Sequence, residues 1–140
     1  MSLITVKAAV DQASREIGIS QNAITQAIGS GDQDISQMVA LLQAVADEVT
    51  LDQPYVDTLG DGYWLIDALS GVRKTRPTSD TDFILFDGRL AIAGLKYRFL
   101  KAKGLEFGEE LRDYSDRMHK LSATANAQVI DLNNDASPFQ

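Results

Sequence analysis

Acid–base or metal chemistry in this sequence would depend on one histidine and on several pairs of adjacent carboxylates. His119 is the only histidine, and there is no cysteine. Zinc sites need several His or Cys ligands, so we expect no metal site and no catalytic triad around His119. The sequence instead favours a simple structural role for His119, as an exposed residue on a helix.

Paired carboxylates could supply the general acid and base of a glycoside hydrolase, such as a small wall hydrolase. Glu109 and Glu110, however, fall in the first turn of an expected helix, where negative charge complements the helix dipole. Asp32 and Asp34 fall where helix caps are needed, and Asp47 with Glu48 is the third such pair. The glycines are not followed by the Lys-Ser/Thr of a phosphate-binding loop. We therefore predict that the protein is not an enzyme, with no catalytic residues, no cofactor and no metal.

The elements that must hold these residues are read from the spacing of apolar side chains. A helix is expected from Leu3 to Ile17, stopped by Gly18, and a shorter one over about 21–28. Asp34 and Gln37 predict a capping box for a third helix. Asp87 is expected to cap a fourth, which ends at Gly104, and the last helix is expected over 107–125. The stripes that carry the longer helices are Leu3, Val6, Val10, Ala13 and Ile17; Ile35, Met38, Leu42, Val45 and Val49; Leu90, Ala93, Tyr97 and Leu100; and Phe107, Leu111, Tyr114, Met118, Leu121 and Ala125.

The fold class predicted from these stripes is mainly α. We expect a helical bundle that ends in a C-terminal helical hairpin, with an extended C-terminal tail. A central loop of about 51–86 would carry one or two short strands, such as 63–66 and 83–86, because proline and glycine interrupt short apolar runs there. The domain is expected to span 1–128 and the tail 129–140. With 140 residues, one core is expected, and no signal peptide or membrane span is predicted.

Charge is distributed unevenly along the chain. Residues 1–70 hold 2 basic and 10 acidic side chains, whereas residues 73–103 hold 8 basic and 3 acidic ones. A net charge of −7 makes the whole protein a poor independent DNA binder. If the chain forms an oligomer, the acidic front half of one subunit could face the basic segment of its neighbour, and charge pairing would then set their register.

One alternative is a DNA-binding regulator. Residues 13–28 are similar to the helix-turn-helix of a Cro-type phage repressor, with Gly18 in the turn and Gln21, Asn22 and Gln26 available to read bases. Against this alternative, no Lys or Arg occurs between Glu16 and Gly71 to hold phosphates.

The run from Phe86 to Tyr114, FDGRLAIAGLKYRFLKAKGLEFGEELRDY, resembles the C-terminal helical hairpin of head-to-tail adaptor proteins of tailed bacteriophages. The pattern is an acidic cap, an Arg-Leu pair, a Gly-Leu-Lys-aromatic-Arg core, an Ala-Lys-Gly-Leu-acidic-aromatic turn and an acidic helix that ends in Tyr. It covers about a fifth of the chain, and Tyr97 stands where the family often has Trp. The matching residues are Asp87, Arg89, Leu90, Gly94, Leu95, Lys96, Tyr97, Arg98, Ala102, Lys103, Gly104, Leu105, Glu106, Phe107, Glu109, Glu110 and Tyr114.

This resemblance implies a structural subunit of the virion neck, made in the host cytoplasm, that forms a homo-oligomeric ring of about 12 copies by following portal symmetry. It implies a portal protein and a downstream tail or neck protein as partners. Genomic DNA would pass through the channel without sequence-specific binding, and no membrane is involved. Three sets of contact residues are expected. Ile130, Leu132 and Phe139 would anchor the tail on the portal. The second set, for the subunit interface, is Arg89, Lys96, Arg98, Lys101 and Lys103. The third set, on a projecting loop that contacts portal, tail or DNA, is Arg73, Lys74 and Arg76.

Overall fold

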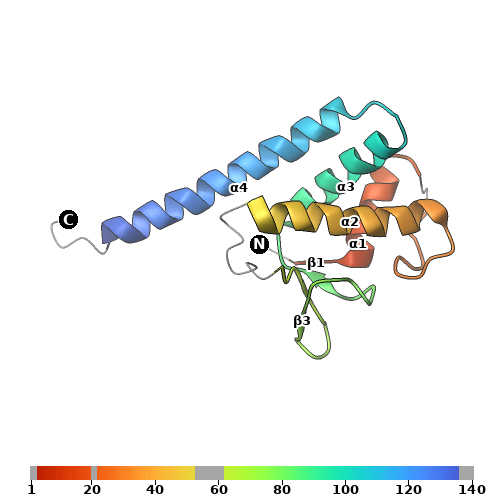
Figure 1. The fold of residues 1–140 in the computed structure, drawn as a ribbon, viewed down its shortest axis with the longest axis horizontal. Helices are drawn as coiled ribbons and strands as arrows, with labels where there is room; N and C mark the ends of the chain where they lie inside the picture. The colour runs from red at the N-terminus through yellow and green to blue at the C-terminus, as the bar shows by residue number, and fades with distance from the viewer. Residues whose placement is uncertain (1–2, 20–21, 53–61, 136–140) are drawn as a thin grey trace.

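The computed structural model describes residues 3–19, 22–52 and 62–135, with side chains described for 3–19, 22–50 and 62–123. Within these residues the protein is mainly α-helical with a small antiparallel sheet, as the sequence predicted (Figure 1). The elements in chain order are β1 (Ile4–Thr5), α1 (Val6–Glu16), α2 (Gln33–Asp52), β2 (Leu65–Ile66), β3 (Arg73–Lys74), β4 (Phe83–Ile84), α3 (Gly88–Ala102) and α4 (Gly108–Asp135).

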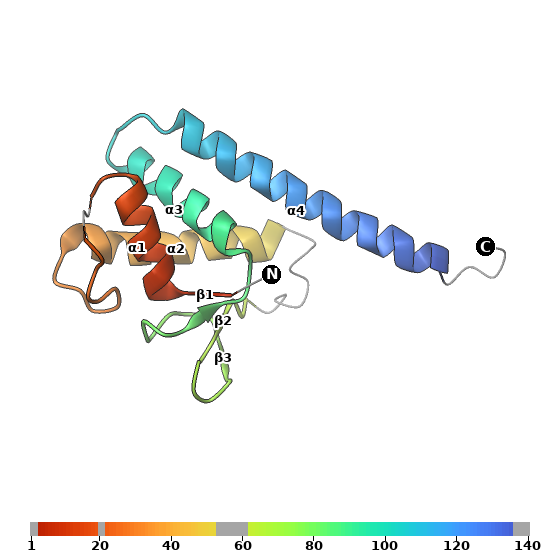
Figure 2. The ribbon, with the colours of Figure 1, turned by 180° about the vertical axis from the view of Figure 1, so that it is seen from behind.

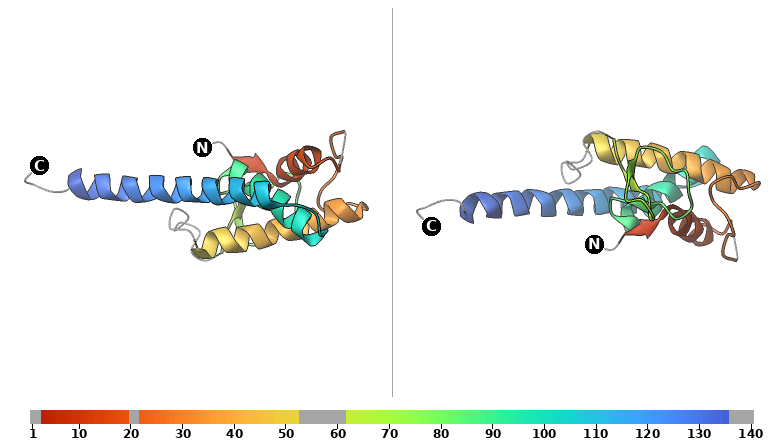
Figure 3. Two further views of the ribbon diagram at one scale, coloured as in Figure 1. Left: turned by 90° about the horizontal axis from the view of Figure 1, so that it is seen from above. Right: turned by 90° about the horizontal axis from the view of Figure 1, so that it is seen from below.

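Helix α3 is the centre of the bundle and contacts α1, α2 and α4. Figure 3 shows α4 lying over α3, with α1 on one side and α2 on the other. Because α3 has neighbours on several sides, its buried residues are not confined to one stripe. They are Leu90, Ala91, Ala93, Gly94, Leu95, Tyr97 and Phe99.

The sheet closes one end of the bundle, in the strand order β1-β4-β2-β3. Ile4 pairs with Ile84, and Leu65 pairs with both Ile84 and Lys74. The two predicted strand regions are therefore present, and the sheet also recruits β1 and β3, which the sequence did not predict. Trp64 is buried beneath the sheet, where its indole nitrogen donates to the Thr75 carbonyl at 2.8 Å.

The short helix predicted over residues 21–28 is wrong for the described part of that segment, because residues 22–28 form bends and turns. Their backbone amides are bound by carboxylates from distant elements. Asp80 accepts from Ala27 N and Ile28 N, at 3.1 and 2.7 Å, and Asp11 accepts from Ile24 N at 2.9 Å. These long-range bonds replace helical ones, so the second helix of the proposed helix-turn-helix does not form.

Side-chain caps start the helices, as expected for chains of this composition. Asp87 caps α3 as predicted, and its carboxylate accepts from Leu90 N at 3.0 Å. Helix α2 is capped by Asp32, one of the two aspartates expected where caps are needed, and not through the predicted capping box of Asp34 and Gln37. The Asp32 carboxylate accepts from the amides of Asp34 and Ile35 at 2.9 and 3.2 Å.

Helix α4 is 28 residues long and extends well beyond the rest of the molecule (Figures 1 and 2). The extended tail predicted from residue 129 is therefore wrong for residues 129–135, which continue the helix. Once a helix exists, each added residue costs little, and asparagine is only about 0.7 kcal/mol worse than alanine. Pro138, the strong helix breaker, lies beyond Asp135, among residues 136–140 that fall outside the described part of the chain.

Candidate functional site

Several residues of the run 86–114 meet a residue of α2 at one junction between α2, α3 and α4. At its centre is Gly94, where a Cβ atom would lie 2.8 Å from Cε1 of Tyr114 and 2.9 Å from Cγ1 of Val45. The ring of Tyr97 lies 5.1 Å from that of Tyr114 and 6.5 Å from that of Phe107, measured between centroids. Glycine therefore permits the close approach of three helices, and the aromatic rings fill the space around it.

A polar pair borders this aromatic cluster. The guanidinium of Arg98 on α3 bonds to the carboxylate of Glu48 on α2 and lies over the Tyr97 ring, 5.4 Å from its centroid. Burial raises the pKa of Tyr114, and the nearby Glu48 carboxylate raises it further, so the Tyr114 hydroxyl stays neutral even above the ordinary tyrosine pKa of about 10. The pair connects α2 to α3 at the edge of the junction.

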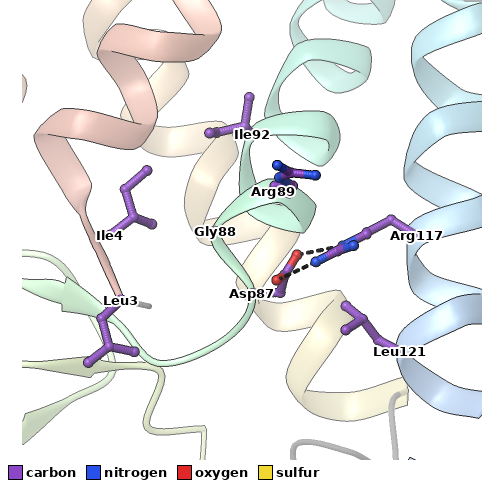
Figure 4. Close-up of a pocket in the computed structure, with 8 residues that line it drawn as sticks. All are labelled: Leu3, Ile4, Asp87, Gly88, Arg89, Ile92, Arg117 and Leu121. Atoms are coloured by element: carbon purple, nitrogen blue, oxygen red, sulfur yellow. Dashed lines mark hydrogen bonds and ion pairs between the residues drawn. The ribbon is translucent and has the colours of Figure 1, made fainter. Parts of the chain in front are cut away.

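A second ion pair connects the start of α3 to α4. Arg117 donates from Nε and Nη2 to the two carboxylate oxygens of Asp87, each at 2.8 Å (Figure 4). Burial by itself would raise the pKa of Asp87, but the hydrogen bonds from Arg117 and from Leu90 N outweigh it and lower this pKa below its usual value. Asp87 is thus both a helix cap and the anchor of α4.

Beside this ion pair lies an open groove of about 520 Å³, bordered by β1, α3 and α4 (Figure 4). Arg89, exposed on the first turn of α3, reaches into it, and Leu3, Ile4, Ile92 and Leu121 supply apolar walls. Its lining holds no serine, cysteine or histidine. The groove therefore lacks the side chains of a serine, cysteine or histidine nucleophile.

Three of the five cations predicted to face a neighbouring subunit have acidic partners within the same chain. Nζ of Lys96 lies 2.7 Å from Oε1 of Glu16, and Arg98 is paired with Glu48 as above. Nζ of Lys103 lies 3.2 Å from Oδ1 of Asp34. The acidic front half thus neutralises part of the basic helix internally, so these pairs alone do not require a second copy. Arg89 and Lys101, the other two predicted interface cations, are exposed.

The three predicted loop cations lie on or just after the β2–β3 hairpin. Arg73 and Arg76 are exposed. Nζ of Lys74 lies 2.7 Å from Oδ1 of the buried Asp82 and donates to Oγ1 of Thr78 at 2.6 Å. Hydrogen bonding to Asp82 raises the pKa of Lys74. Lys74 therefore fastens the hairpin to the body, while Arg73 and Arg76 face outward.

The tip of this hairpin was missed by the sequence reasoning. Leu69 is 98% exposed and Val72 is 59% exposed. The available signal was the turn composition of residues 67–71, DALSG, directly after the apolar run 63–66. We predicted a strand at 63–66 but none at 73–74, where the sequence is cationic, so the hairpin was not expected.

The predicted tail anchors are placed differently from expectation. Ile130 and Leu132 belong to α4, but their side chains lie outside the described part of the chain. Phe139 lies entirely outside the described residues. Their role in docking stays a prediction.

The residues considered for catalysis lie apart from any cluster suited to chemistry. His119 is exposed on α4, as predicted, and Glu109 and Glu110 lie in the first turn of that helix. Among the described residues there is no group of three or more potential metal ligands, and no helix there is long and apolar enough to cross a membrane.

Comparisons of the chain with protein-family models, curated proteins and solved structures found no match. A functional assignment therefore depends on the residues themselves.

Proposed function

We propose that this protein is a structural, non-enzymatic subunit of a bacteriophage head-to-tail connector. Copies of the chain would form a ring that docks on the portal and joins it to the tail. The observation that carries the proposal is the helical junction: Gly94, Tyr97, Phe107 and Tyr114 all belong to the adaptor-like motif, and they meet at one point.

The shape of α4 fits a connecting role. At about 1.5 Å per residue its 28 residues span about 42 Å. Its N-terminal part is fixed to the body by Tyr114 and Arg117, while the remainder extends away from the bundle (Figure 1). Such an arm can carry residues 129–140, with the predicted anchors Ile130, Leu132 and Phe139, to a portal surface at a distance from the subunit body.

The charge of the chain fits a DNA channel that does not retain DNA. Tight nonspecific binding requires many cations that neutralise phosphates. Here the net charge is −7, and several cations of α3 are already paired with carboxylates of the same chain. Genomic DNA would therefore pass such a ring without sticking.

Docking on a portal tests this proposal. Purified portal rings are mixed with the full chain and, in parallel, with a variant that lacks residues 129–140, and co-sedimentation is measured. We expect the full chain to co-sediment and the shortened chain to remain in the supernatant, with a circular dichroism signal that falls only by the share of the helical residues 129–135 that the deletion removes. Absence of any complex with the full chain would contradict the proposed function, whereas equal docking by both chains would remove the C-terminal segment from the mechanism.

A further inference from the structure

Two surface patches of unlike charge account for four of the six large apolar side chains that are exposed in the described part of the chain. The hairpin patch lies on the β2–β3 hairpin and just after it, and the turn patch lies where α3 passes into α4. The hairpin patch consists of Leu69, Val72, Arg73 and Arg76; the turn patch consists of Leu105, Glu106, Glu109 and Leu111.

The hairpin patch is apolar, cationic and held in one conformation. The Asp67 carboxylate accepts from the amides of Leu69 and Ser70, each at 2.9 Å, and Asp67 N donates to the Val72 carbonyl at 2.9 Å. Gly71 adopts a φ of +72°, which closes the turn at little steric cost. A surface ordered before it binds loses less conformational entropy on binding. This tip nevertheless leaves Leu69 almost completely in water.

The turn patch is apolar and anionic. Leu105 is 56% exposed and Leu111 is 36% exposed. Residues 104–111 contain three glutamates, and the flanking cations are Lys101, Lys103, which is paired with Asp34, and Arg112. The turn is ordered too, because Leu105 N donates to the Leu100 carbonyl at 2.9 Å and Gly108 N to the Glu106 carboxylate at 3.2 Å.

The patches lie on opposite sides of the molecule. In Figure 1 the β2–β3 hairpin projects below the bundle, while the α3–α4 turn lies at the top, and the reverse view in Figure 2 shows the same separation. A single subunit therefore cannot bring its own two patches together.

We infer that the hairpin patch of one copy binds the turn patch of a second copy, in a head-to-tail contact between subunits. The inference rests on the proposed ring and names the surfaces that join its subunits. Apolar side chains would meet in the centre, with the arginines of one copy facing the glutamates of the next.

Complementarity of charge is what selects a second copy as the occupant. Two hairpin patches would bring arginines together, and two turn patches would bring glutamates together, so each patch disfavours pairing with itself. An asymmetric contact of this kind repeats from copy to copy and closes into a ring when the rotation allows it.

Site-specific cross-linking tests the contact directly, because the natural chain contains no cysteine. Leu69→Cys and Leu105→Cys are prepared separately in the full chain, one with an affinity tag so that the products differ in mass. They are mixed in equal amounts at high concentration and treated with a short bismaleimide. Both sites are exposed, so neither substitution should disturb folding.

We expect the mixed Leu69–Leu105 product to exceed either homodimer by on the order of tenfold, and to fall when salt is raised. A mixture of Leu69→Cys with His119→Cys, an exposed position outside both patches, serves as the matched control and should show no preference. A mixed yield no higher than the control, or a predominance of Leu69–Leu69 product, would overturn the inference.

Charge exchange gives a second, independent readout. Arg73→Glu with Arg76→Glu should abolish the mixed cross-link, as should Glu106→Lys with Glu109→Lys, and combining the two sets should restore it. If the arginine variant and the glutamate variant each keep the mixed cross-link, and their combination gives no increase, these charges do not form the contact. Portal co-sedimentation separates the two proposals. Docking without the mixed cross-link would contradict only the subunit contact. The mixed cross-link without docking would contradict only the portal function.

Discussion

At the scale of single residues, the junction depends on groups whose replacement has specific costs. Gly94 is needed because α2 and α4 approach α3 at the same place. Asp87 is needed because it caps α3 and holds Arg117 of α4 with the same carboxylate. The tight packing at Gly94 and the ion pair of Asp87 depend on distances between helices, which the spacing of residues in the sequence does not show.

Replacing Gly94 with alanine should lower the free energy of unfolding by about 1–3 kcal/mol, because the new Cβ would overlap Tyr114 and Val45. Urea denaturation measures the change. Gly31→Ala is the matched control, since a Cβ there meets nothing within 4 Å. Equal stability of the Gly94→Ala protein and the natural chain would mean that the helices are not packed this closely.

Replacing Asp87 with asparagine keeps a good helix cap but removes the ion pair with Arg117. The pKa of Asp87 is lowered in the folded state, so its contribution to stability is present above the ordinary aspartate pKa of about 3.9 and is lost as the pH falls through the lowered value. We expect the variant to be less stable by about 1–3 kcal/mol at neutral pH, with the difference shrinking below about pH 4.

Urea denaturation from pH 7 to pH 3 measures this dependence. Asp116→Asn serves as a control, because Asp116 is an exposed carboxylate on α4, next to Arg117. A difference that stays constant across this range would show that the Asp87 carboxylate does not titrate as the structure requires.

At the scale of elements, apolar periodicity predicted the helices that pack on the core. It gave wrong predictions where long-range hydrogen bonds or helix extension determine the local structure. Most residues of the stripes of α1, α2, α3 and the first part of α4 belong to the core or pack against it, whereas Leu3 and Leu111 are exposed. Residues 22–28 have similar spacing, but Asp80 and Asp11 bind their amides from distant positions in the sequence. The last turns of α4 have no body to pack against, so no stripe marked them.

Strands β1 and β3, and the pairing of the whole sheet, escaped prediction for a related reason. Each strand is only two residues long. The residues that pair in β1 and β4, Ile4 and Ile84, are also far apart in the sequence. Local alternation cannot show such a pair.

The hairpin tip should become mobile when its side-chain hydrogen bonds are removed. In Asp67→Ala the amides of Leu69 and Ser70 lose their acceptor, and we expect their hydrogen exchange to speed up while that of Leu90 does not change. Asp67 keeps this role down to low pH, because backbone hydrogen bonds lower its pKa to about 2. Unchanged exchange at Leu69 and Ser70 would mean that other contacts order the tip.

At the scale of the whole molecule, the uneven charge seen in the sequence has a different use from the one expected. We predicted that acidic and basic halves meet between subunits, and the structure shows several of those pairs inside one chain, such as Lys96 with Glu16. Exposed charges lie on the hairpin, on the α3–α4 turn and on α3 itself, where Arg89 and Lys101 are exposed. Sequence could indicate the imbalance but not which cations are already paired, because pairing depends on how the helices cross.

The mass of the complex formed with a portal ring tests the central claim most directly. Portal rings are saturated with the full chain, freed of excess by size exclusion, and weighed by light scattering or native mass spectrometry. The account predicts a ring-sized addition of about one copy per portal subunit, roughly 12 in total. A portal ring that leaves the column with its original mass would contradict the account.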